Sequence, residues 1–218
     1  DKLKGKKVLI TAGPTYEKID PVRFIGNHST GKMGFALAEV CAEYGAEVEL
    51  VTGPVGLSVS HPNIRRTNVQ SAEEMYVAAV NLFPQMDAAI LCAAVADFTL
   101  DHVAAEKIKR KGDELHLSLV PTKDIAAELG RLKRCNQKLV GFALETTNEK
   151  ENAKQKMKKK NLDFIVLNSL KDAGAGFSYD TNKVTILSAT EEQSFPLKAK
   201  REVACDIIEK LCESIGNL

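Results

Sequence analysis

The sequence predicts an α/β protein with a three-layer, Rossmann-like, mostly parallel sheet, helices on both faces and a small β extension. Two observations carry this prediction. Short apolar runs alternate along the chain with longer segments in which apolar residues recur at helical spacing. The 218 residues, 44% of them hydrophobic and 27% charged, also have the composition of an ordinary globular protein. We therefore expect residues 1–218 to form a single domain.

The first part of the chain has the pattern of a strand, a helix and a second strand. Residues 8–10 form a β-branched apolar run that ends in a Gly-Pro turn, and the helical spacing of residues 35–44 stops at Gly45. A second apolar run follows at residues 48–51. A unit of this order closes right-handed and pairs its strands in parallel.

The alternation continues to the end of the chain. Ser71 and Glu74 have the spacing of a capping box and predict the start of a helix that continues over residues 75–83. Residues 88–96 predict a central strand that is apolar on both faces, and alternating leucines predict a half-exposed strand at 115–119. Further strands are expected at 139–143, 164–167 and 183–187, and further helices at 124–132, 148–160 and 202–215.

Two loops of the predicted sheet are unusually long. They cover residues 11–34 and 93–111, whereas loops between strands and helices usually have about 2–6 residues. Both follow strands, and ligands of open α/β sheets bind outside the carboxyl ends of the strands. We expect the chemistry of the protein in these two loops.

The first long loop resembles known phosphate-binding motifs only in part. Residues 26–33 satisfy G-x-x-x-x-G-K, but Met33 stands where a P-loop needs Ser or Thr for Mg²⁺. No G-x-G-x-x-G opens the first helix. The backbone N–H groups at this helix start suit a phosphate or carboxylate, and the alternative is a turn that only lets the helix approach the sheet. Tyr179 and Lys183 have the spacing of short-chain reductases, but turn-forming residues separate them.

Charge and cysteine patterns exclude several function classes. A net charge of +1 lacks the basic footprint of nucleic-acid binding, and no apolar run approaches the ~20 residues of a membrane span. The five cysteines suggest neither a disulfide framework nor a zinc site. We expect a cytoplasmic protein without nucleic-acid or membrane partners.

Two groups of lysines are candidates for binding a phosphate. Lysines 107, 109 and 111 suit a lid over a triphosphate, and Lys156 and Lys160 share one helix face. The alternative for both groups is an ordinary solvated surface.

Four motifs in order resemble the bacterial phosphopantothenoylcysteine synthetase family: residues 20–34, 93–98, 106–109 and 141–143. The resemblance covers nearly the whole chain and implies one nucleotide-binding ligase domain. In many bacteria this synthetase is the C-terminal half of a bifunctional coenzyme A protein that has a flavin-dependent decarboxylase upstream. The start of this chain at Asp1 fits a piece of such a protein.

The resemblance implies a reaction in two steps. The carboxylate of 4′-phosphopantothenate attacks the α-phosphate of CTP, which releases pyrophosphate and leaves an acyl-cytidylate. The amine of cysteine then displaces CMP. Mg²⁺ is expected as the ion that screens the triphosphate, although the sequence indicates no ligands for it. Animal relatives of the family use ATP, and only the bacterial type of the motifs favours CTP. A homodimer is also implied.

The family's functional residues map onto this chain by motif. Asn27 corresponds to the asparagine that holds the acyl-cytidylate carbonyl, and Lys107 to the lysine that serves CTP and its activation. Arg23, Asn27 and Ala93 are expected at the substrate, the first two near a dimer interface. The nucleotide is expected at Cys92, Ala93, Asp97, Lys107, Lys123, Asp124, Ile125, Phe142, Lys156 and Lys160.

One departure and two alternatives remain open. The family's Asn-Pro-Asp-Ile stretch has Thr122 and Lys123 in its first two positions here, which puts the contacts at Lys123 in doubt. A protein that binds a nucleotide or phosphopantothenate without catalysis is one alternative, and a nicotinamide or flavin reductase is another. Asn27 and Lys107 oppose the first because binding alone does not need both, and the missing glycine fingerprint opposes the second.

Overall fold

An eight-stranded sheet organises the protein, as a computed structural model shows for residues 1–112, 114–145, 148–169 and 176–216. The strand order is β13-β12-β10-β9-β6-β1-β4-β5. Six neighbouring strands run in parallel: β5 (Ile64–Asn68), β4 (Glu47–Thr52), β1 (Lys7–Ala12), β6 (Ala88–Leu91), β9 (Lys138–Glu145) and β10 (Phe164–Ser169). The last two, β12 (Val184–Ser188) and β13 (Glu192–Ser194), are antiparallel.

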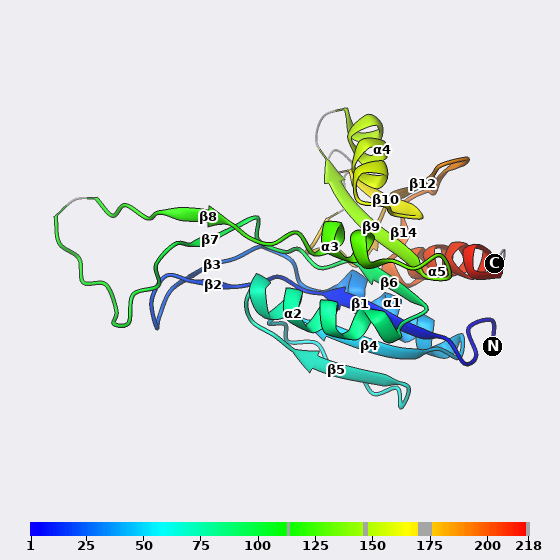
Figure 1. Ribbon diagram of the computed structural model, residues 1–218, viewed down its shortest axis with the longest axis horizontal. Coiled ribbons are helices and arrows are strands. Elements are labelled where there is room, and N and C mark those ends of the chain that lie inside the picture. Colours follow the sequence, from blue (N-terminus) through cyan, green and yellow to red (C-terminus); the bar gives the residue numbers. More distant parts are fainter. Residues whose placement is uncertain (113, 146–147, 170–175, 217–218) are drawn as a thin grey trace.

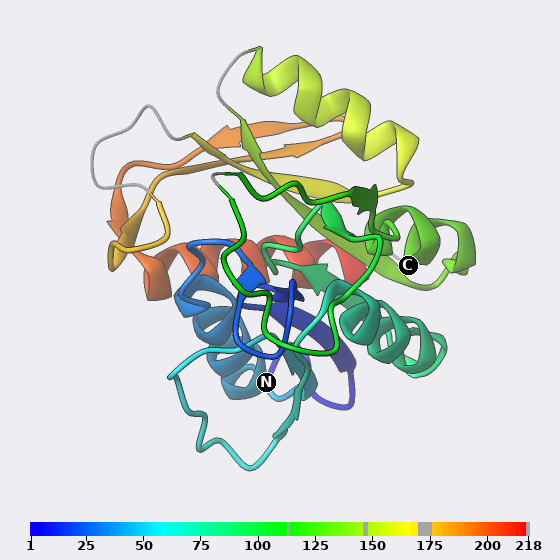
Figure 2. The ribbon, with the colours of Figure 1, turned by 90° about the vertical axis from the view of Figure 1, so that its left-hand side faces the viewer.

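Helices cover both faces of this sheet (Figure 2). α1 (Lys32–Glu43) and α5 (Lys200–Gly216) pack on one face, and α2 (Ala72–Leu82), α3 (Ile125–Leu132) and α4 (Glu149–Lys159) pack on the other. A 3-10 turn, η1 (Phe83–Gln85), ends α2. Successive strand residues face opposite layers, so Ile10 joins the core under α1 and Leu9 joins the core under α2. The predicted three-layer, mostly parallel fold is confirmed.

The chain changes direction across the sheet between β1 and β6. From β1 the strands β4 and β5 follow to one side, and β6, β9 and β10 follow to the other. In open α/β sheets, ligands bind outside the carboxyl ends of the strands at such a reversal. Both unusually long loops begin at this point of the sheet.

These two loops extend into an arm that projects beyond the sheet (Figure 1). The arm consists of two hairpins: β2 (Glu17–Lys18) pairs with β3 (Phe24–Ile25), and β7 (Phe98–Leu100) pairs with β8 (Leu119–Pro121). The hairpins are joined where Ala104 N–H donates to the carbonyl oxygen of Ile19 at 3.0 Å. A third small sheet, β11 (Thr181–Asn182) with β14 (Lys198–Ala199), lies before α5.

Two strand predictions needed correction, and β5 was missed. The strand expected at 88–96 ends at Leu91, because Ala93 N–H then bonds to the side-chain hydroxyl of Thr11 and Ala94 N–H bonds to the carbonyl oxygen of Gly13, just after β1. The strand expected at 115–119 was wrong except for Leu119, and its leucines are exposed on the arm. β5 was not expected because it is a polar edge strand without an apolar run.

Candidate functional site

A cavity of about 290 Å³ opens at the carboxyl ends of β1, β6 and β9. It lies on the side of the sheet covered by α3 and α4, at the point where the strand order reverses. Its lining residues are Thr11, Leu91, Ala93, Val95, Asp97, Thr122, Lys123, Asp124, Ile125, Ala126, Gly141, Phe142, Lys156, Lys160 and Leu162. Eight of the ten residues expected at a nucleotide are therefore brought together by the fold.

Threonine hydroxyls hold one side of this cavity. The hydroxyl of Thr11 accepts a hydrogen bond from Ala93 N–H at 3.3 Å, and that of Thr15 accepts one from Ala96 N–H at 3.0 Å. The hydroxyl of Thr122 donates to the carbonyl oxygen of Ala96 at 2.6 Å. Because these bonds replace sheet pairing after Leu91, the backbone of this segment stays ordered beside the cavity without continuing the strand.

The opposite side of the cavity is formed by the start of α3 and the end of α4. Asp124 caps α3 by accepting the N–H of Ala127 at 3.0 Å, and it forms an ion pair with Lys160. Desolvation acts to raise the pKa of Asp124, but the Ala127 hydrogen bond and Lys160 hold it below its usual value. Lys156 lies one turn earlier on α4 and lines the same cavity. The wall is therefore rich in positive charge.

Lys123, on the rim of the cavity, interacts with two side chains of α2. Its ammonium nitrogen donates to Glu73 at 2.7 Å and lies 4.9 Å from the ring centroid of Tyr76. The hydrogen bond to Glu73 raises the pKa of Lys123. Lys123 therefore contacts the cavity while its charge is shared with α2.

Four expected site residues do not line this cavity: Arg23, Asn27, Cys92 and Lys107. Cys92 packs with the core under α1 and α5, on the opposite face from Ala93, as strand alternation requires. Burial raises the pKa of the Cys92 thiol to about 12, which leaves it protonated and unreactive near neutral pH. Arg23 and Lys107 belong to the arm, and Asn27 follows β3.

The glycine-rich loop lets α1 lie close to β1 and leaves the start of α1 without a side-chain cap. Gly31 precedes α1 with a φ of 79°, and a side chain on Gly34 would place its Cβ 2.5 Å from that of Ala12. These glycines let α1 approach β1, as one reading of the loop expected. No side chain caps the start of α1, so its first N–H groups also suit an anion. Asn27 accepts the N–H of Ser29 through Oδ1 at 3.1 Å.

Two lysines lie beside this helix start. Lys32 pairs with Asp180 at 2.7 Å, and Thr30 donates its hydroxyl to the carbonyl oxygen of Phe177 at 2.8 Å. Lys200 is 6% exposed and donates to Phe177 O at 3.2 Å. Desolvation, together with the charge of Lys32, lowers the pKa of Lys200. The segment after residue 175 is thus held against the glycine-rich loop by side chains from three elements.

Sequence reasoning missed two polar residues at this edge of the sheet, Lys200 and Asn168. Asn168 lies near the carboxyl end of β10, and its side-chain oxygen is buried with no hydrogen-bond partner among the described residues. Buried polar atoms are normally bonded, so this oxygen is a candidate for contact with a ligand. The signal in the sequence was the polar pair that follows the apolar run 164–167, of which Asn168 is the first residue. Lys200 gave no signal because lysine is ordinarily a surface residue.

The structure also bears on the motifs of other enzyme classes. Thr181 and Asn182 form a strand, so Tyr179 and Lys183 are not one helical turn apart, as expected. Within the described ranges, no group of three or more His, Cys, Asp or Glu side chains is arranged to hold a metal ion. Among the same residues, no helix has the length and apolar character needed to cross a membrane.

Comparison with known proteins decides the family. The family model described as "DNA/pantothenate metabolism flavoprotein C-terminal domain" matches residues 3–215. The chain belongs to this family. Membership confirms the resemblance that the four motifs indicated, and a crystal structure of the C-terminal domain of coenzyme A biosynthesis bifunctional protein CoaBC confirms the fold. That structure is 40% identical with a TM-score of 0.85, and the match covers 100% of this chain and 99% of that one.

Curated relatives of the family carry two kinds of name. Coenzyme A biosynthesis bifunctional protein CoaBC of Haemophilus influenzae is 44% identical over 97% of this chain and 52% of its own length. A protein named cysteine/cysteine sulfinic acid decarboxylase, from an unknown prokaryotic organism, is 56% identical over 96% of this chain and 58% of its own length. The chain thus spans little more than half the length of these relatives.

Proposed function

We propose that the chain is a phosphopantothenate–cysteine ligase that uses CTP and acts in coenzyme A biosynthesis. The observation that carries this proposal is the cavity at the sheet's switch point, where eight residues expected at the nucleotide meet. The 44% identity to a CoaBC protein supports it. Because such relatives are bifunctional and about twice as long, we also infer a flavin-dependent decarboxylase upstream in the full-length protein.

In the first step the phosphopantothenate carboxylate forms a bond to the α-phosphorus, and the bond to the β-phosphate breaks. Negative charge grows on the departing pyrophosphate, and we expect Lys156 and Lys160, which line the cavity, to stabilise it. Lys107 is expected to join them from the arm. The two ends of its loop meet at the cavity rim, where Thr122 N–H donates to the carbonyl oxygen of Asp97 at 2.9 Å.

In the second step the cysteine amine attacks the acyl carbonyl, the amine loses a proton, and CMP leaves. The carbonyl oxygen gains negative charge during the attack and needs a hydrogen-bond donor. Asn27 suits this role because Ser29 N–H already engages its oxygen and leaves its amide nitrogen as the donor. The phosphate of phosphopantothenate is expected at the start of α1, beside Lys32 and Lys200.

Arg23 and Asn27 lie outside the cavity of their own chain, which supports the expected homodimer. The arm also exposes large apolar side chains at Val22, Phe24, Phe98, Val103, Leu115, Leu117 and Leu119. Exposed apolar residues gathered on one element mark association surfaces. We therefore propose that two copies pair through their arms and that Arg23 and Asn27 act at the interface.

Mg²⁺ would enter this site on the triphosphate. Asp124 is occupied by Lys160 and by the start of α3, so Asp97 is the carboxylate of the cavity best suited to a metal. One carboxylate together with phosphate oxygens is a usual environment for Mg²⁺. The ion would neutralise part of the negative charge of the phosphates.

A second candidate function follows from the relative that is 56% identical and named a decarboxylase of cysteine or cysteine sulfinic acid. That name belongs to a protein of which this chain spans 58%. Release of CO₂ from cysteine without a nucleotide would favour this candidate. The cavity with its lysine-rich wall favours the ligase, because a decarboxylase has no triphosphate to neutralise.

One set of incubations tests both candidates. The protein is mixed with 4′-phosphopantothenate, cysteine and Mg²⁺, and CTP, ATP, GTP or UTP is added in turn. We expect pyrophosphate and phosphopantothenoylcysteine with CTP. Pyrophosphate with ATP alone would overturn the nucleotide assignment, and CO₂ without pyrophosphate would favour the decarboxylase.

A further inference from the structure

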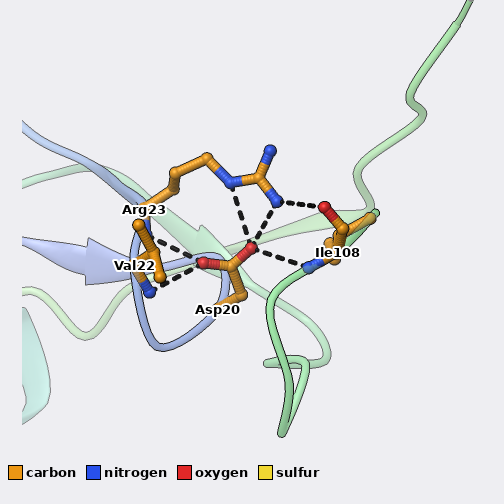
Figure 3. A network of polar contacts seen from close by, with 4 residues as sticks. All are labelled: Asp20, Val22, Arg23 and Ile108. Atoms are coloured by element: carbon orange, nitrogen blue, oxygen red, sulfur yellow. Dashed lines mark hydrogen bonds and ion pairs between the residues drawn. The ribbon is translucent and has the colours of Figure 1, made fainter. Parts of the chain in front are cut away.

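One carboxylate inside the arm receives five hydrogen bonds (Figure 3). The carboxylate belongs to Asp20, whose side chain is completely buried. Oδ1 accepts the backbone N–H groups of Val22 and Arg23, both at 2.8 Å. These two bonds shape the turn between β2 and β3.

The second oxygen reaches across to the other hairpin. Oδ2 of Asp20 accepts hydrogen bonds from Nε and Nη2 of Arg23, at 3.0 and 2.5 Å. It also accepts one from the backbone N–H of Ile108 at 3.1 Å. Arg23 completes a ring by donating from Nη2 to the carbonyl oxygen of Ile108 at 2.8 Å. Both polar backbone groups of Ile108 are therefore bound by a charged pair that is 85 or more residues away in sequence.

Ile108 is the residue directly after Lys107, in a stretch that forms no helix or strand. Residues 107–111, here the lysine segment, are exposed at every position except Ile108, which is partly buried. A segment of this kind has little of its own to fix its position. The peptide N–H that Asp20 accepts belongs to the bond between Lys107 and Ile108, so Asp20 fixes the chain next to the lysine.

We propose that Asp20 is a positioning residue that sets the place of Lys107 by binding the backbone of Ile108 together with Arg23. The turn that bears Arg23 also leads to Asn27, so the same carboxylate joins the segments expected to serve the two half-reactions. Asp20 itself has no direct role in the chemistry, because all of its hydrogen-bond capacity is used within the arm. The catalytic part of this inference rests on the proposed function.

A first measurement tests the contact without any reference to activity. Trypsin needs an accessible extended backbone, so we expect slower cleavage after Lys107, beside the bound Ile108, than after Lys111. Asp20→Asn should raise the ratio of these two rates about tenfold, the loss expected for one charge-assisted hydrogen bond. Lys111 serves as the reference within the same molecule, and mass spectrometry assigns each cut.

A second buried carboxylate provides the matched control. Glu17 lies in β2, is 2% exposed and accepts the N–H of Ala72 at the start of α2. It does not bond to the lysine segment in the described structure. Glu17→Gln should leave the tryptic ratio unchanged, even where it lowers the melting temperature as much as Asp20→Asn does.

The kinetic measurement is pyrophosphate release in one turnover without cysteine, which isolates the first half-reaction. Asp20→Asn should slow it about ten- to a hundredfold, the usual cost of a misplaced catalytic group. In a Lys107→Gln background the same substitution should have no further effect, because the residue that it positions is gone. Glu17→Gln should leave the rate unchanged in both backgrounds.

Each other result overturns the inference. An unchanged tryptic ratio shows that Asp20 does not hold the backbone at Ile108, and effects that multiply in the double variant show that it does not act through Lys107. A raised ratio with a normal first step removes the catalytic role. If Asp20→Asn does not fold, Ile108→Pro removes the N–H that Asp20 accepts, together with the isoleucine side chain, and should slow the same step, whereas Ile108→Val keeps that N–H and should not. If the wild type uses no nucleotide, the proposed function fails, and with it the catalytic role of Lys107. The tryptic ratio still shows in that case whether Asp20 binds the backbone of Ile108.

Discussion

The ammonium nitrogen of Lys160 lies 2.9 Å from a carboxylate oxygen of Asp124, on the wall of the cavity. Lys160 follows the last residue of α4, and Asp124 precedes the first residue of α3. This ion pair therefore joins two helices that cover the same face of the sheet. It keeps a cation at the cavity before any ligand arrives.

The two lysines of the cavity wall should bind the nucleotide. Replacing both Lys156 and Lys160 by Gln should weaken CTP binding at least tenfold, because one charge-assisted hydrogen bond contributes about 1.5–3 kcal/mol. The unfolding free energy should change little, since partly exposed ion pairs contribute about 0–1 kcal/mol. Isothermal titration calorimetry and thermal unfolding measure the two effects.

Lys158 is the control for this prediction. It lies on the same helix, is exposed and does not line the cavity. Lys158→Gln should leave the affinity for CTP unchanged. An equal loss in this variant would mean that the helix attracts CTP only through its general charge.

The two catalytic candidates should affect different half-reactions. Asn27→Asp should accumulate acyl-cytidylate, because losing an oxyanion donor costs about 10²–10³ in rate, here in the cysteine step. Lys107→Gln should slow the formation of the intermediate instead. Mass spectrometry of quenched reactions measures both, and normal turnover of Asn27→Asp would contradict the role assigned to it.

Asn168 should matter for binding more than for stability. Its buried side-chain oxygen has no partner among the described residues, and a buried polar group without a partner costs about 1–3 kcal/mol. Asn168→Ala removes the unpaired oxygen and therefore this cost. The free energy of unfolding should then fall by less than it does when another buried side chain is shortened to alanine. The KM for one of the three substrates, CTP, phosphopantothenate or cysteine, should rise. A large loss of stability with unchanged KM values would show that Asn168 is purely structural.

Asp20 should make stability depend on pH on the acid side. The Arg23 side chain, with three backbone N–H groups, holds the pKa of the Asp20 carboxyl well below its usual range in spite of burial. Below the unfolded value of about 3.9, the unfolded chain takes up a proton that the folded protein refuses, so stability falls with pH. The stability difference between wild type and Asp20→Asn should be constant from about pH 7 to 5 and shrink below about pH 4.

Urea unfolding at constant ionic strength gives this difference at each pH. A difference that stays constant down to pH 3 would mean that the carboxylate is not held in its charged form. The measurement is independent of activity and complements the tryptic experiment on Ile108.

Local patterns were enough to predict most of the sheet and its helices. The capping box is an example, since the hydroxyl of Ser71 accepts Glu74 N–H at 3.1 Å. The carboxylate of Glu74, however, accepts the N–H of Gln70 at 2.8 Å, one residue before the expected partner. Spacing determines which residues are neighbours, but packing determines which atoms meet.

Some residues expected at the candidate site line the cavity and others do not, for a related reason. Motifs identified Ala93 and Cys92 together, yet neighbouring residues of an extended chain face opposite sides, and only Ala93 lines the cavity. Alternating leucines at 115 and 117 resembled a core-facing strand, but no other part of the described chain covers them. An apolar pattern indicates that a side chain suits burial, not that a partner is present in the same chain.

The sequence by itself determined the alternation of strands and helices, because apolar periodicity and short-range spacing are properties of neighbouring residues. Its motifs identified the family and, through that resemblance, the residues expected at the nucleotide. Only the tertiary structure decided that Asp20 binds Ile108 and that Lys160 pairs with Asp124. The contact between Asp20 and Ile108 spans 88 residues. Such contacts depend on how strands and loops are brought together in space, and no local pattern in a single sequence records that geometry.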